Sequence, residues 1–172
     1  MVTLNKFLAN IKQVNMETNI GITAKNRQAV AVELSKLLAD EFLLYTKTRN
    51  AHWNVEGSDF HAMHIFFESQ YEQLDEIMDS VAERIRTIGH YAAGTLKSFL
   101  KLTHLSEYTE TKNDSLDLIK ELLSDHESMI EFIRGNIDPF ADKYKDAGTS
   151  DFITGIMETH EKMAWMLRAH VK

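Results

Sequence analysis

The sequence predicts an all-α protein: a four-helix bundle with a short extra helix in the connection between its second and third helices. Two observations predict this fold. The 172 residues include one proline and seven glycines, which leaves room for long helices and gives few turns for a sheet. Apolar residues recur at helical spacing in four long stretches, and up-down bundles often need a crossover between the second and third helices. We expect one domain, the bundle over 25–172, preceded by an arm or short docking helix at 1–24.

The first two long helices are expected on either side of a glycine-containing turn. The first runs over about 26–53 and places a histidine-tryptophan pair at its end. Ser58 or Asp59 can cap the second, because a short oxygen side chain accepts hydrogen bonds from free amide groups at a helix start. This central helix should stop by Gly89. Its apolar side comprises Met63, Phe67, Tyr71, Leu74, Met78, Val81 and Ile85.

A long connection and a third helix follow. A short apolar stretch at 96–102 is expected to form one or two helical turns within the connection. The third helix should start near Asn113 or Asp114, and Gly135 and Pro139 should end or kink it, because proline lacks an amide hydrogen and clashes with the preceding turn.

Different structures are expected at the two ends of the chain. Residues 1–18 carry apolar side chains at helical spacing, which is typical of a docking helix, and 19–23 form a linker. The fourth long helix should start after Gly148, with Thr149 or Ser150 as its cap, and should run almost to the last residue.

Composition excludes several classes of protein. The formal net charge of -7 disfavours nucleic-acid binding, which rewards clustered lysine and arginine. No cysteine is present, so disulfide and thiolate chemistry are excluded. No apolar run approaches the roughly eighteen residues of a membrane span, and the first ten residues lack the pattern of a secretory signal. We therefore expect a cytoplasmic protein with no membrane association.

The central helix carries an unusual polar edge. His64, Glu68, Asp79 and Glu83 fall on one side of the helical wheel, beside the apolar stripe rather than opposite it. Carboxylates next to a buried surface need charge compensation, which a metal ion supplies. Imidazole and carboxylate ligands without thiolate suit iron, zinc or manganese. His52, just before the turn, can join the His64 side.

One helix cannot close such a site. His64 and Asp79 are fifteen residues apart, which is roughly 22 Å along a helix axis. A second, antiparallel copy of the helix, related by a two-fold axis near Gln73 and Leu74, would place His64 and Glu68 of one subunit against the two later acids of the other. The spacing thus predicts two equivalent metal sites between subunits.

The stretch HWNVEG at 52–57, followed by Phe60, His64, Glu68 and DSVAER at 79–84, resembles the Dps family of mini-ferritins. The resemblance covers most of the chain from about residue 25, and the WML at 165–167 fits it too. Position 68 is an aspartate in many members, so the glutamate here is a small departure that keeps the charge on a longer arm. Trp53 matches a tryptophan beside the family's metal centre.

The resemblance implies a ferritin-like fold and a ferroxidase centre shared by two subunits. His52, His64 and Glu68 would come from one subunit, and Asp79 and Glu83 from its neighbour. Two iron ions per site would be oxidised, with hydrogen peroxide preferred to dioxygen, and ferric mineral would collect inside a dodecameric shell. The resemblance also implies that the segment 146–151 lines a three-fold pore for iron entry, with Asp142, Asp146 and Asp151 as its acids; a polar loop with a capping acid is the simpler reading.

Other readings stay open for several groups. His61 is a second-shell donor or simply exposed, and the acids Glu72, Asp75 and Glu76 face either a mineral cavity or solvent. Some Dps relatives compact DNA through a tail rich in lysine and arginine. Here residues 1–25 carry only three lysines against one glutamate, so we expect weak DNA binding or none.

Two enzyme classes are disfavoured by spacing. Classical ferritins and bacterioferritins hold their di-iron site inside one bundle with Glu-x-x-His pairs, and no histidine here has a glutamate three residues before it. The HExxH motif of many metallopeptidases is also missing from the sequence.

Overall fold

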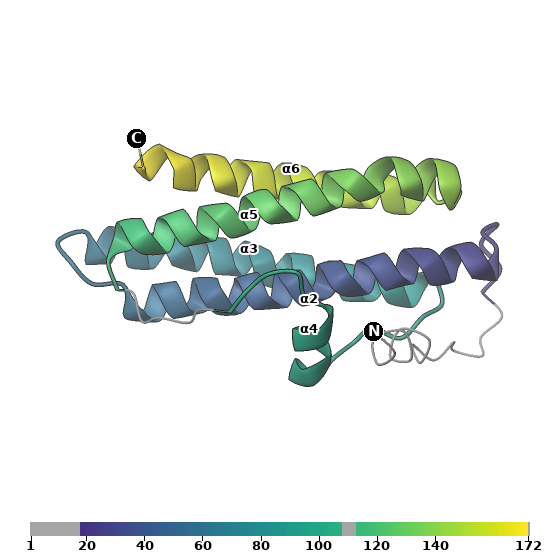
Figure 1. Ribbon diagram of the computed structural model, residues 1–172, viewed down its shortest axis with the longest axis horizontal. Helices are drawn as coiled ribbons and strands as arrows, with labels where there is room; N and C mark the ends of the chain where they lie inside the picture. Colours follow the sequence, from purple (N-terminus) through teal and green to yellow (C-terminus); the bar gives the residue numbers. More distant parts are fainter. Residues whose placement is uncertain (1–17, 108–112, 172) are drawn as a thin grey trace.

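Four long helices form the bundle, and a fifth, short helix lies in the crossover between two of them (Figure 1). The computed structural model describes residues 18–107 and 113–171. In order, the elements are α2 (Ala24–Asn54), α3 (Phe60–Thr87), α4 (Leu96–Leu102), α5 (Ser115–Asp138), the π-helical turn η1 (Pro139–Lys143) and α6 (Ala147–His170). The predicted all-α fold and the short helix at 96–102 are confirmed. The expected arm at 1–24 falls mostly on residues 1–17, which lie outside the described part.

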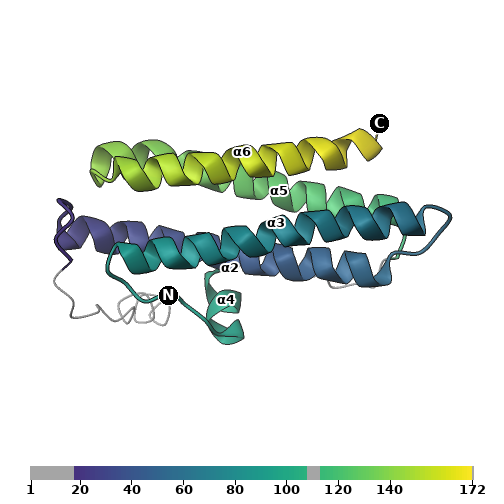
Figure 2. The ribbon, with the colours of Figure 1, turned by 180° about the vertical axis from the view of Figure 1, so that it is seen from behind.

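The helices pack as two antiparallel pairs, α2 with α3 and α5 with α6, seen from the two opposite sides in Figures 1 and 2. Since α3 and α5 run in the same direction, the chain between them must return along the bundle, and α4 lies beside α2 on this return path. Where α3 begins, the backbone amide of Glu56 donates to the carbonyl of Asn113, which brings the turn before α3 to the start of α5.

Two helix starts depart from the predictions. α6 is capped by Asp146, whose carboxylate accepts from the Thr149 amide at 2.9 Å, and not by Thr149 or Ser150. Asp59 stands at the N-cap of α3, but its carboxylate accepts from the Ser115 hydroxyl at 2.6 Å and makes no cap bond. α5 passes through Gly135 and ends at Asp138, directly before Pro139, as expected for a proline at this place. Asp114 caps α5, as expected.

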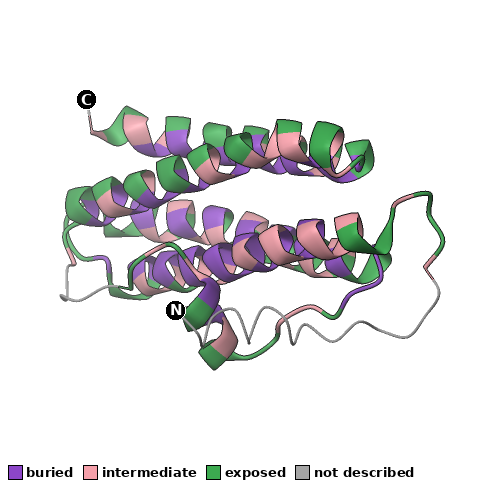
Figure 3. Ribbon diagram, turned by 45° about the vertical axis from the view of Figure 1, so that its right-hand side comes forward, coloured by how far each residue is buried: buried purple, intermediate pink, exposed green. Residues whose placement is uncertain are grey.

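The apolar faces of all four long helices meet along the centre of the bundle, where Figure 3 shows the buried surface turned inward. Burying these side chains supplies the main stabilisation of the fold. The largest fully buried ones are Phe67, Phe140, Leu34, Leu37, Leu44, Leu74, Ile85, Ile88, Leu118, Ile119, Leu122 and Met129. No helix within the described ranges is both long and apolar enough to cross a membrane.

A chain of buried polar side chains crosses this core. The Nε2 atom of His160 on α6 lies 2.8 Å from Glu41 Oε1 on α2, and its Nδ1 atom lies 2.9 Å from His126 Nδ1 on α5. All three side chains are completely buried. Burial, and then the nearby His160, lowers the pKa of His126 well below its ordinary value. His126 is therefore neutral at physiological pH.

A second buried charge joins α2 to α5. Lys47 Nζ lies 2.5 Å from Asp125 and 3.1 Å from Glu121, and it donates to the Ser106 carbonyl in the crossover. Burial raises the pKa of Asp125, although the adjacent Lys47 lowers it. The lysine thus compensates a carboxylate that could otherwise not stay ionised in the core.

Candidate metal centre

His52 and His64 meet at the end of the bundle where α2 stops and α3 begins. Their rings stack with centroids 3.7 Å apart and planes 22° from parallel. His52 Nδ1 lies 2.8 Å from the His64 carbonyl oxygen, and His64 Nδ1 lies 2.8 Å from the His52 carbonyl oxygen. The two helices therefore hold the histidines by a reciprocal pair of hydrogen bonds.

These bonds fix the tautomer of each ring. A carbonyl oxygen can only accept, so each Nδ1 must carry a hydrogen and donate it. In the neutral imidazoles the lone pair then sits on Nε2, the atom left free to bind a metal ion. A histidine ligand that donates its other ring hydrogen to a backbone carbonyl is the usual arrangement at protein metal sites. The predicted ligands His52 and His64 are thus brought together in the form that a metal ion requires.

Glu68 lies one helical turn after His64 and is half-buried. Its Oε1 atom accepts a hydrogen bond from the Tyr71 hydroxyl at 3.0 Å. The Tyr71 ring stands edge-on to His52, with centroids 5.2 Å apart. Burial, and then the hydrogen bond and charge of Glu68, raises the pKa of Tyr71. The phenol keeps its hydrogen and links the carboxylate to the histidine pair.

Asp79 and Glu83 lie further along α3, one turn apart, and both are exposed. Neither side chain forms a hydrogen bond or ion pair with another described residue. Within the described ranges of a single chain, no group of three or more His, Asp or Glu side chains is close enough to hold a metal ion. One chain therefore presents the histidines with Glu68 at one end of α3 and the two acids elsewhere on it, and does not bring the five predicted ligands together.

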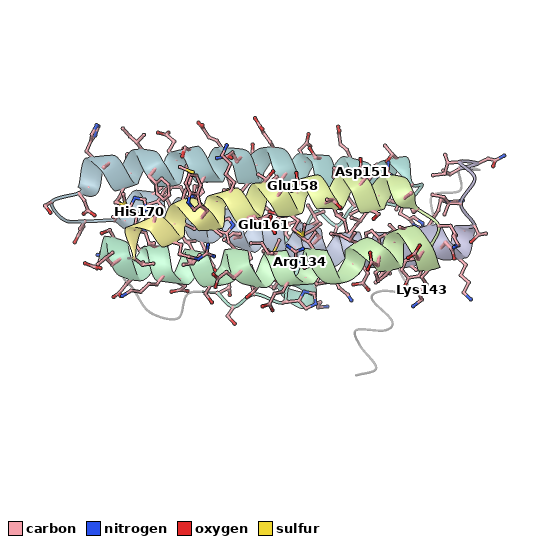
Figure 4. All side chains as sticks on the ribbon, turned by 90° about the horizontal axis from the view of Figure 1, so that it is seen from above. Arg134, Lys143, Asp151, Glu158, Glu161 and His170 are labelled. Carbon is pink, nitrogen blue, oxygen red and sulfur yellow. The ribbon has the colours of Figure 1, made fainter. Side chains whose placement is uncertain are left out.

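The three acids expected at a pore have different surroundings. Asp146 is buried, caps α6, and also accepts from Arg84 at 3.2 Å and from the Thr149 hydroxyl at 2.5 Å. Its carboxylate is thus engaged within its own chain, as in the simpler reading of a capping acid. Asp142 and Asp151 are exposed. Figure 4 shows Asp151 near the η1 end of α6, far from His170 at the other end.

The groups whose role stayed open lie at the surface of the single chain. His61, Glu72, Asp75 and Glu76 are all exposed, so their side chains do not pack in the core of this chain. Trp53 is also exposed, at 62%, and the Arg49 guanidinium carbon lies 5.1 Å from the centre of its ring.

Sequence reasoning missed three features of this region. Tyr71 reads as one more apolar residue on the buried stripe of α3, although its position three residues after Glu68 already allows a contact on the helix surface. Arg49, which lies 4.3 Å from the centre of the Tyr71 ring, reads as an ordinary polar residue of α2. The reciprocal bonds of the histidines have no sequence pattern, because their acceptors are backbone carbonyls.

A model of the ferritin-like domain matches residues 32–172 of this chain. An uncharacterized low temperature-induced protein of Nostoc sp. is 42% identical over 154 residues, which cover 90% of this chain and 86% of that protein. The DNA protection during starvation protein of Helicobacter pylori is 36% identical over 138 residues, covering 80% of this chain and 95% of that protein.

Solved structures of Dps proteins also superpose on this chain. The Dps protein of Vibrio cholerae O1, described as a ferritin-like diiron-carboxylate protein, superposes with a TM-score of 0.85 at 30% identity and covers 91% of this chain and 98% of its own. The Dps protein of Bacillus brevis superposes with a TM-score of 0.82 at 30% identity, covering 88% of this chain and 100% of its own.

Proposed function

Since this chain belongs to the Dps family of ferritin-like proteins, we propose that it oxidises Fe(II) at metal centres shared between two subunits and stores the ferric product inside a hollow shell. The oxidant is hydrogen peroxide or dioxygen, with peroxide preferred, and the assembly is a dodecamer of identical subunits. Removing Fe(II) and peroxide together protects the cell from oxidative damage. The cytoplasmic location expected from the sequence stays a prediction.

The observation that carries the proposal is the histidine pair. Backbone carbonyls hold both Nδ1 hydrogens, so both Nε2 lone pairs are available, and Glu68 stands one turn away. Such a half-site offers two imidazole nitrogens and, one helical turn away, a carboxylate; these ligand types suit a divalent first-row metal. Asp79 and Glu83 of the partner subunit would supply the remaining oxygens. Their exposure and lack of partners within the described chain support that role.

The chemistry follows from the ligand set. Each Fe(II) ion loses one electron, and one peroxide molecule takes up two electrons and two protons as its O–O bond breaks, giving two waters. Anionic carboxylate oxygens stabilise the more highly charged Fe(III) and so favour the oxidation. Glu68, with Asp79 and Glu83 of the partner subunit, would provide that charge, while the two histidines hold the ion in place.

Entry of iron is proposed at the α5–α6 end of the bundle. Exposed carboxylates arranged around a symmetry axis would lower the barrier for a dication by focusing the field. Asp142 and Asp151 are exposed and suit this role. The buried Asp146 instead stabilises the turn before α6 by capping that helix.

The test is anaerobic loading of the metal-free protein with Fe(II), followed by a pulse of peroxide, with ferric absorbance recorded against a protein-free control. The proposal expects fast oxidation and a soluble ferric product that elutes with the protein. The double variant Asp79→Asn, Glu83→Gln keeps the size of both side chains and removes their charge, so it should lose the fast phase. Wild-type rates in that variant, or no acceleration by the native protein, would overturn the proposal.

The alternative is a DNA-compacting protein of the same fold. The Helicobacter pylori relative carries DNA protection in its name, which is the observation that favours this reading. The net charge of -7 and the few lysines at the start of the chain argue against it, because binding to the phosphate backbone depends on clustered cations. We rank it second.

A further inference from the structure

Tyr71 contacts both a proposed carboxylate ligand and a proposed histidine ligand of the same subunit. Its hydroxyl donates to Glu68 at 3.0 Å, and its ring meets the edge of His52 at 5.2 Å. Because Tyr71 follows Glu68 by three residues on α3, the two side chains are neighbours on the helix surface. A phenol at this place can set the orientation of the carboxylate.

The Tyr71 ring is itself held on other sides. The Arg49 guanidinium lies 4.3 Å from its centre, a cation–π contact, and the Tyr45 ring stands edge-on at 6.1 Å. Arg49 in turn donates to the Tyr45 hydroxyl at 3.2 Å. Three residues of α2, Tyr45, Arg49 and His52, therefore contact the ring and limit its movement.

We propose that Tyr71 is a positioning residue of the metal centre, which holds the Glu68 carboxylate in its metal-binding orientation. This inference rests on the proposed function, because it assigns Tyr71 to the same centre. It also explains how the glutamate at position 68 can act as a ligand where many family members have an aspartate. The longer arm of glutamate has one more rotatable bond than that of aspartate, and a fixed hydrogen bond to one oxygen removes part of that freedom before the ion arrives.

The hydrogen bond leaves the second carboxylate oxygen for the metal ion. A donor that satisfies one oxygen restricts the carboxylate plane, so binding through the other oxygen costs less ordering. Partners of this kind commonly change metal affinity by about tenfold to a hundredfold when they are removed. Tyr71→Phe removes only the hydroxyl and keeps the ring, with its contacts to His52 and Arg49.

The experiment measures Zn²⁺ binding to the metal-free oligomer by titration calorimetry, and records the visible absorption of bound Co²⁺ as a report on its coordination. Tyr71→Phe should bind Zn²⁺ about tenfold more weakly than the native protein and should change the Co²⁺ spectrum. In a Glu68→Ala background the same substitution should have no further effect, because the hydroxyl would have nothing left to position.

Tyr91→Phe is the matched control: the same atom is lost from an exposed tyrosine beyond the far end of α3, whose ring contacts Arg86 and no proposed ligand. It should bind Zn²⁺ as the native protein does. Equal affinity in native protein and Tyr71→Phe would overturn the inference, and so would an equal loss with and without Glu68. If His64→Ala left native Zn²⁺ binding unchanged, the proposed centre itself would fall, and this inference with it.

Discussion

His126 and His160 share a single hydrogen between their Nδ1 atoms, which lie 2.9 Å apart in the centre of the bundle. Because His160 Nε2 faces the Glu41 carboxylate, it carries a hydrogen, and in the neutral ring its Nδ1 must then accept from His126. The arrangement is complete only while His126 is neutral. A second hydrogen on this ring would sit on Nε2, which is buried and has no partner among the described residues.

The first prediction is that acid weakens the bundle through His126. Its pKa is lowered by burial, so below about pH 6.5 the unfolded chain binds a proton that the folded chain does not. The free energy of unfolding is then highest above that pH and falls as the pH drops, by about 1.4 kcal/mol per unit for one proton, until the lowered pKa is reached. His126→Asn keeps a donor near the Nδ1 position but does not titrate.

Denaturation at a fixed subunit concentration from about pH 7.5 to 5 checks this prediction. The variant should show a smaller loss of stability on acidification than the native protein. Part of the loss should remain, because burial and then Arg27 also lower the pKa of His90. His170→Asn, at an exposed position, serves as control. Identical pH dependence in native protein and His126→Asn would contradict the prediction.

The second prediction concerns the buried Lys47. Lys47→Met should lower the free energy of unfolding by about 3–5 kcal/mol, because Asp125 would lose its compensating charge in the core. Lys36→Met removes a lysine from a partly exposed pair with Glu33 on the same helix, and should cost less than about 1 kcal/mol. Chemical denaturation of both variants gives the comparison. Similar costs would show that burial of the pair does not matter.

The third prediction separates the three acids at the α5–α6 turn. Asp146→Asn weakens the α6 cap and the bond to Arg84, so it should cost roughly 1–3 kcal/mol of stability. Asp142→Asn and Asp151→Asn should leave stability nearly unchanged and slow the uptake of Fe(II). Thermal unfolding and stopped-flow oxidation on the same samples measure the two effects. An unfolding midpoint of Asp146→Asn equal to that of Asp142→Asn would contradict the structural role.

The fourth prediction tests whether the centres are shared. A variant without the histidines (His52→Ala, His64→Ala) and a variant without the partner acids (Asp79→Asn, Glu83→Gln) should each be inactive alone. When they are unfolded together and reassembled, roughly a quarter of the sites combine two intact halves, because pairs form at random across a two-fold axis. Ferroxidase activity should return to that extent. Mixing the two without reassembly is the control, and no recovery after reassembly would contradict a shared centre.

The fifth prediction is that DNA binding is weak. In a gel-shift titration with plasmid at about 150 mM salt, the native protein should leave the DNA unshifted, because its net charge is negative and few cations are available to displace counterions. The same titration at low salt serves as the reference. A strong shift at the higher salt would favour the alternative function.

The helices could be predicted from the sequence because the spacing of apolar residues along a helix is a property of the sequence alone. Spacing of apolar residues located α2, α3, α4 and α5 to within a few residues, and it placed His64 and Glu68 on one edge of α3. The start of α6 was wrong because Asp146, Thr149 and Ser150 are all residue types that cap helices. Arg84, which comes from another helix and donates to Asp146, is one contact that the local sequence does not reveal.

The partners of the interior polar groups could not be predicted, because these partners lie on other helices. Glu41, His126 and His160 each have apolar residues one helical turn before and after them, and only packing brings the three together. The chance that a buried histidine meets a partner cannot be read from one helix. The role of Tyr71 was hidden in the same way, because a partly buried tyrosine satisfies the apolar pattern whether or not its hydroxyl is used.

The reciprocal bonds of His52 and His64 would couple the proposed metal binding to the alignment of two helices. Each ring depends on a carbonyl of the other helix, so a slip of α2 against α3 would release both rings at once. The unfolded chain has no such constraint, and an ion that binds only the aligned form stabilises that form by mass action. Loading with metal would therefore select correctly packed subunits: subunits with α2 and α3 aligned would bind the ion and be stabilised, and misaligned ones would bind none.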